Sequence, residues 1–204
     1  MKTRRDFVIA NLAALPALVA LAGSAGASGA SRDGIAPLRS PPGPSAAYFP
    51  NVPVVDHTGR EHLWYDDLVR DRAVVVNFVT LDHDLRHGIT KNLAQAGRLA
   101  AERGIDRVAM LTIALDAPPV ARLAAHVAAR RIGPRWLFLT GRPAAVDLIR
   151  SFLFWVPAGA SSVHGEGHDH ALAVARYGNE ALARWASFPV RSRPESIAQR
   201  MAWI

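Results

Sequence analysis

The chain has 204 residues, with 24 lysines and arginines against 17 aspartates and glutamates, a formal net charge of +7, and no cysteine. Without thiols it can form no disulfide and cannot carry out thiol–disulfide exchange. Its basic residues alternate with acids and form no tract interleaved with aromatic side chains, so nucleic-acid binding is not expected. The mild excess of positive charge instead suits anionic membrane surfaces or acidic partner proteins.

The N-terminal 30 residues have the pattern of an export signal. Two arginines at positions 4 and 5 are followed by an apolar run, Val8–Leu21, and then by small residues. This order is typical of a twin-arginine signal peptide, which predicts a periplasmic protein. A retained membrane anchor is the weaker alternative, because the run falls short of the roughly 20 residues that span a bilayer and contains Asn11 and Pro16.

Residues 31–46 are rich in Pro, Gly and Ser, and we expect a flexible linker there. Residues 47–204 then form one domain without internal repeats. It opens with a predicted hairpin, whose strands at 52–55 and 61–64 flank a turn at Thr58–Gly59. A short helical turn is expected at 65–69.

The rest of the domain alternates between strand and helix patterns, which predicts an α/β three-layer sandwich with a central mixed sheet, most simply thioredoxin-like. The β-branched run Ala73–Val79 and the run 108–115 are expected to be adjacent central strands. The other expected strands are 136–139, 171–175 and 182–185, with a turn at 178–179, and the expected helices are 92–103, 120–131, 143–152 and one starting at Pro194.

Two histidines, His83 and His87, follow the strand at 73–79 where it runs into a loop and a helix. A thioredoxin-type fold keeps its reactive cysteine pair at this kind of junction. The spacing of four residues can bring two imidazoles onto one helical face. Because an isolated pair with this spacing is also common on solvated helices, the spacing alone is weak support for a metal site.

Six segments carry a likeness to a known family. They are Tyr48–Val55, Trp64–Leu68, Val75–Phe78, Leu111–Asp116, Trp136–Gly141 and Arg176–Trp185. In these segments the chain resembles the Sco/SenC family, thioredoxin-fold copper proteins that assist assembly of the copper site of cytochrome c oxidase. The likeness spans essentially the whole predicted domain.

The resemblance implies a metal site made of three histidines. The family uses two cysteines four residues apart after the Asn-Phe strand, and these positions fall on His83 and His87. Its distal histidine falls on His170. The proline after the second cysteine is Gly88 here, and the Asp-Pro-x-x-Asp loop is shortened to residues 116–119, which keep only the first acid.

Such a site would favour copper as Cu(II) over Cu(I), with zinc as a further possibility, because soft thiolates rather than imidazoles favour Cu(I). Three nearby aspartates, Asp82, Asp84 and Asp169, are candidates to orient the imidazoles. His164 and His168 are either further ligands or solvated loop residues. The last three histidines, His57, His62 and His126, are expected to be surface or packing residues.

Two functions are compatible with these features. The first is an exported copper-binding protein that serves cytochrome oxidase assembly, with a respiratory oxidase subunit or another copper carrier as its partner. The second is a metal-free scaffold of the same fold that docks a partner protein. Neither is an enzyme of the thiol–disulfide class, since there is no cysteine.

Overall fold

The computed structural model of the protein describes residues 47–130, 132–154 and 171–204. The predicted signal (1–30) and linker (31–46) lie outside these ranges, so the domain boundary at residue 47 stays a prediction. None of the helices in the described ranges combines the length and apolar character that crossing a bilayer requires.

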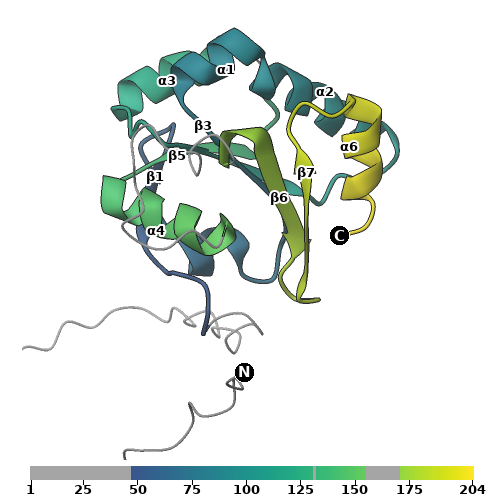
Figure 1. The fold of residues 1–204 in the computed structure, drawn as a ribbon, viewed down its shortest axis with the longest axis horizontal. Coiled ribbons are helices and arrows are strands. Elements are labelled where there is room, and N and C mark those ends of the chain that lie inside the picture. The colour runs from purple at the N-terminus through teal and green to yellow at the C-terminus, as the bar shows by residue number, and fades with distance from the viewer. Residues whose placement is uncertain (1–46, 131, 155–170) are drawn as a thin grey trace, which may run out of the picture. The chain divides into compact units, whose positions relative to one another are not determined.

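A mixed sheet organises the described part of the chain (Figure 1). Its seven strands lie in the order β2-β1-β5-β4-β3-β6-β7. Strands β3, β4 and β5 are parallel, while β1 pairs antiparallel with β5 and β6 pairs antiparallel with β3. The strand bounds are β1 Pro53–Asp56, β2 Glu61–Leu63, β3 Ala73–Val79, β4 Ala109–Ala114, β5 Trp136–Thr140, β6 Val174–Asn179 and β7 Arg184–Pro189.

Helices cover both faces of this sheet, which confirms the three-layer prediction. The bounds are η1 Trp64–Val69, α1 Leu81–His87, α2 Ile89–Glu102, α3 Val120–Ala128, α4 Pro143–Phe154 and α6 Pro194–Met201. Apolar residues of α2, α3 and α6 share one core with one face of the sheet. Those of η1 and α4 share a second core with the other face.

The predicted pairing of the two central runs is confirmed. Strands β3 and β4 are parallel neighbours, in a register that runs from Val74 opposite Ala109 to Val79 opposite Ala114. A buried polar row crosses the sheet within this apolar surface. The Thr112 hydroxyl donates to Asn77 Oδ1 at 2.7 Å, and Trp136 Nε1 donates to the Thr112 hydroxyl at 2.8 Å.

The C-terminal hairpin is present, but its predicted boundaries were wrong. Residues 171–173 are helical, β6 extends through Gly178 and Asn179, and β7 begins only at Arg184. Gly178 was interpreted as a turn residue, whereas it lies within the strand opposite Trp185. A Cβ on Gly178 would lie 2.5 Å from atoms of the Trp185 ring, so glycine is needed there for close packing.

The segment after β3 contains one more helix than we predicted. Helix α1 carries both histidines and ends at Gly88, whose left-handed φ of 63° separates it from α2. As a result α2 begins at Ile89 and not at residue 92. The first hairpin and the helical turn at 65–69 are present as expected, with the turn extended to Trp64.

Candidate functional site

The two histidines after β3 lie together on α1. The Thr80 hydroxyl caps this helix by accepting from the backbone N–H of His83 at 3.2 Å. The two histidines are four residues apart, and His83 is partly buried whereas His87 is exposed. Their ring centroids are 4.3 Å apart, with an angle of 48° between the ring planes. The helix therefore presents two neighbouring imidazoles at the carboxyl end of a central strand.

The other residues considered for the site are three histidines and one aspartate. His164, His168, Asp169 and His170 all fall outside the described residues. Within the residues that are described, no group of three or more histidine, aspartate or glutamate side chains is arranged to hold a metal ion. The structure thus brings together two of the three predicted ligands, and the third stays a prediction.

Asp84 does not have the role that we expected. It lies between the two histidines in sequence, but its carboxylate is fully buried and faces the domain interior. One oxygen accepts from the backbone N–H of Thr90 at 2.7 Å, and the other accepts from the Thr90 hydroxyl at 2.8 Å. The second oxygen also meets His126 Nε2 at 2.8 Å and Arg130 Nε at 2.9 Å. Asp84 therefore ties α1 to the start of α2 and to α3, instead of orienting an α1 imidazole.

Burial lowers the pKa of His126, although its hydrogen bond with Asp84 acts in the opposite direction. A neutral His126 donates through Nε2, because an ionised carboxylate can only accept. The charged partner of Asp84 is then Arg130, whose side chain is 16% exposed. We expected His126 to be a surface or packing residue, and the structure makes it part of a buried polar network.

The other acid beside the histidines is exposed. The side chain of Asp82 is 68% exposed and lies 3.6 Å from the guanidinium of Arg122. His62 lies at the first hairpin, where its Nε2 atom is 2.9 Å from Asp56 Oδ2. The two residues are six apart in the sequence, so this is a local contact of the hairpin. Neither arrangement adds a ligand to the imidazole pair.

No family model matches the sequence, and comparison with curated proteins finds no relative. Similar folds are found among solved structures. A SCO1/SenC family lipoprotein from Bacillus anthracis aligns with a TM-score of 0.59 and 16% identity, over 76% of this chain and 93% of that one. Yeast Sco1 with copper bound aligns with a TM-score of 0.56 and 13% identity, over 74% and 87%.

A third similar structure is Bradyrhizobium japonicum ScoI with copper bound, which has a TM-score of 0.54 and 16% identity over 74% of this chain and 95% of that one. At these identities the likeness establishes the fold. The chain has the thioredoxin-like fold that the Sco/SenC proteins share, without the cysteine pair, since it contains no cysteine.

Proposed function

We propose that this protein is an exported, Sco/SenC-like metal-binding protein that holds its ion through His83, His87 and His170. The ion is copper, with zinc as the alternative. The role is copper delivery or holding during cytochrome oxidase assembly, in the periplasm after twin-arginine export. Two of the similar structures contain copper, which supports a metal site on this fold.

The observation that carries the proposal is the proximity of the two imidazoles on α1. Two nitrogens at about 2.0–2.1 Å from one ion, at a tetrahedral angle, are roughly 3.3 Å apart. A distance of 4.3 Å between the ring centroids is compatible with that nitrogen–nitrogen separation once the side chains have rotated. The donor chemistry also fits, because neutral imidazole is a good ligand for Cu(II) and Zn(II).

The absence of sulfur sets the expected metal preference. Three imidazoles should bind Cu(II) more tightly than Zn(II), following the usual order for divalent ions, and should lack the Cu(I) affinity that thiolates provide. Because only neutral imidazole binds, affinity should fall as the pH drops through about 6.5. A respiratory oxidase subunit or another copper carrier is the partner that this role requires.

One observation favours the second candidate, a metal-free scaffold. Leu85 lies on α1 between the two histidines and is 65% exposed, so a partner that covered this helix would bury apolar surface together with the imidazoles. In that case α1 would be a docking helix, and the imidazoles would contact the partner directly.

Metal analysis of the natively exported protein and titration of the full chain with Cu(II), Zn(II) and Cu(I) separate the two candidates. We expect about one bound ion, with tighter binding of Cu(II) than of Zn(II) at pH 7.5, roughly one unit above the reference histidine pKa. The double variant H83A/H87A should lose most Cu(II) binding. L85A, on the same helix, is the matched control and should retain it.

Three other results would redirect the assignment. Unchanged Cu(II) affinity in H83A/H87A would transfer the ion to the histidines at 164–170. Equal losses in the double variant and in L85A would point to damage to α1 and not to lost ligands. Absence of metal from the wild type, with no binding in titration, would favour the scaffold.

A further inference from the structure

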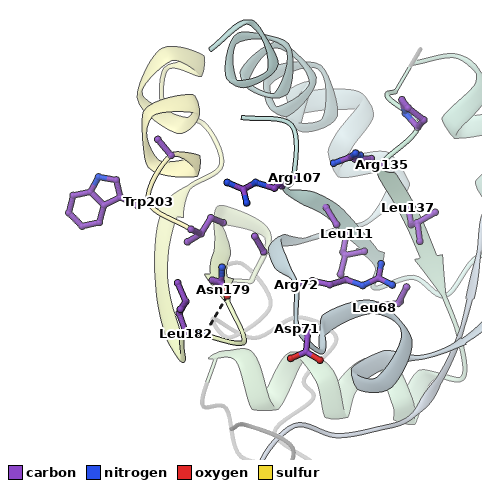
Figure 2. Close-up of a pocket in the computed structure, with 15 residues that line it drawn as sticks. Leu68, Asp71, Arg72, Arg107, Leu111, Arg135, Leu137, Asn179, Leu182 and Trp203 are labelled. Carbon is purple, nitrogen blue, oxygen red and sulfur yellow. Dashed lines mark hydrogen bonds between the residues drawn. The ribbon is translucent and has the colours of Figure 1, made fainter. Parts of the chain in front are cut away.

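A basic hollow lies at the end of the sheet opposite α1 (Figure 2). Its volume is about 800 Å³, and it is lined by residues at the amino ends of β3, β4 and β5, by the β6–β7 turn and by the C-terminal residues. The seven residues of strand β3 lie between this hollow and α1. At about 3.3 Å per residue, roughly 20 Å separates the hollow from the imidazole pair.

Three arginines mark the hollow, one before each central parallel strand. Arg72 directly precedes β3, Arg107 lies two residues before β4, and Arg135 directly precedes β5. The amino ends of adjacent parallel strands meet at one edge of a sheet, so the strand pairing brings these cations together. All three arginines are exposed. Among the described residues, none of the three has an ion pair with an acidic side chain, and Asp71 is the one acidic side chain in the lining.

Apolar groups accompany the cations. The floor is formed by Leu68, Leu111 and Leu137. At the margin, Leu182 is 56% exposed and Trp203 is 77% exposed, and Figure 2 shows the Trp203 ring projecting outward from the domain. Arginine beside an exposed indole and an exposed leucine is the combination that lies stably at the headgroup level of a bilayer.

The chain also enters the domain close to this end. Phe49 stacks on Tyr65 with ring centroids 5.6 Å apart. The Tyr65 hydroxyl donates to Glu180 at 2.9 Å, and Glu180 accepts from the backbone N–H of Asp71 at 3.0 Å. A short series of contacts therefore links the first described aromatic core residue to the lining of the hollow.

We propose that this end of the domain docks on an anionic bilayer, with a phospholipid headgroup in the hollow against Arg72, Arg107 and Arg135. Leu182 and Trp203 insert beside it. A bilayer fits better than a soluble acidic ligand, because the two most exposed apolar side chains of the hollow face outward, where a soluble ligand would leave them in water. Docking in this orientation holds α1 on the side away from the membrane, whether or not the histidines bind a metal.

The lack of cysteine allows a direct test on the full chain. Single substitutions L182C and L85C place one fluorescent probe at each end of the domain, at two leucines that are both well exposed. Quenching of each probe by a soluble quencher is measured with vesicles of phosphatidylcholine alone and with vesicles that also contain phosphatidylglycerol. Each probe variant is also made in two triple-substituted forms. One carries R72Q/R107Q/R135Q, and the matched control carries R86Q/R122Q/R142Q, which replaces three exposed arginines that follow the carboxyl ends of the strands.

We expect the anionic vesicles to protect the probe at residue 182 and to leave the probe at residue 85 accessible. Each arginine near an anionic surface contributes about fivefold in affinity. The lipid concentration for half-maximal protection should therefore rise about 100-fold in R72Q/R107Q/R135Q and much less in the control. Protection should also weaken at high salt. The apolar N-terminal run is present in every variant, so the readout is the difference between the two triple variants and not the absolute lipid concentration.

The proposal is overturned if both probes stay equally accessible, if the probe at residue 85 is the protected one, or if the two triple variants lose protection equally. The last result would indicate only long-range attraction by the net charge. Protection of residue 182 by soluble hexaglutamate, without protection by anionic vesicles, would assign the hollow to an acidic protein partner and would equally refute lipid docking.

Discussion

Replacing Asp84 with alanine should destabilise the domain strongly, although the residue lies in sequence between the two imidazoles of α1. The substitution removes the acceptor for Thr90, His126 and Arg130 at once. It also leaves the Arg130 guanidinium, 16% exposed, without its carboxylate. Removing one partner of a buried ion pair costs about 3–5 kcal/mol, and hydrogen bonds to charged groups contribute about 1.5–3 kcal/mol each. Because these contributions overlap, we expect a loss of about 3–5 kcal/mol in the free energy of unfolding.

Urea denaturation followed by circular dichroism measures this loss. An unchanged slope of the unfolding free energy against urea concentration would confirm that both proteins unfold in the same way. Asp82→Ala is the control, because Asp82 is 68% exposed and its contact with Arg122 is 3.6 Å long. Its cost should stay within about 0.5 kcal/mol. A double-mutant cycle of D84A with H126A should give a coupling above about 0.5 kcal/mol. If D84A cost less than about 1 kcal/mol, the network would not be the connection between α1, α2 and α3 that we infer.

Two further predictions concern the same domain. Burial lowers the pKa of His126, so below about pH 6.5 the unfolded chain binds a proton at this residue that the folded chain does not bind. The free energy of unfolding should therefore decrease as the pH drops through about 6.5. In His126→Gln this decrease should be smaller, as measured by urea denaturation across that pH range. An identical slope in the two proteins would contradict the assignment. Gly178→Ala would put a Cβ 2.5 Å from the Arg184 carbonyl oxygen and from the Trp185 ring, so it should lower the free energy of unfolding by about 1–3 kcal/mol. Gly133→Ala should be nearly neutral, because a Cβ there would have no neighbouring atom within 4 Å. Equal effects at the two glycines would show that the hairpin relaxes around the new methyl group.

The sequence was sufficient to predict the layered fold, because each of its central elements carries a strong local pattern. The run that became β3 is rich in β-branched residues and the run that became β4 is short and mostly apolar, so both patterns favour buried strands. The C-terminal hairpin was misplaced because a glycine followed by asparagine has the same local signal in a turn as in a strand. What decides between them is the ring of Trp185 above Gly178, and this is a contact between two strands.

The candidate site was predictable only in part, for a related reason. The spacing of His83 and His87 gave their common helical face. Asp84, which lies between them, contacts His126 and Arg130, 42 and 46 residues further along the chain. A contact at that separation leaves no periodic signal in the sequence. An aspartate beside histidines therefore suggested a role at the imidazoles, although in the structure it stabilises the helix that carries them.

The buried polar row across β3, β4 and β5 has a consequence for how the chain chooses its strand alignment. The segments Val74–Val79 and Ala109–Ala114 are apolar on both faces, so sliding one past the other by two residues would still bury apolar side chains. Such a slip between β3 and β4 would separate Asn77 from Thr112, and a slip between β4 and β5 would separate Thr112 from Trp136. Either would leave polar groups without partners inside the sheet. An unpaired buried polar group costs about 1–3 kcal/mol. The hydrogen bonds among Asn77, Thr112 and Trp136 thus favour one strand register over others that would also bury apolar side chains.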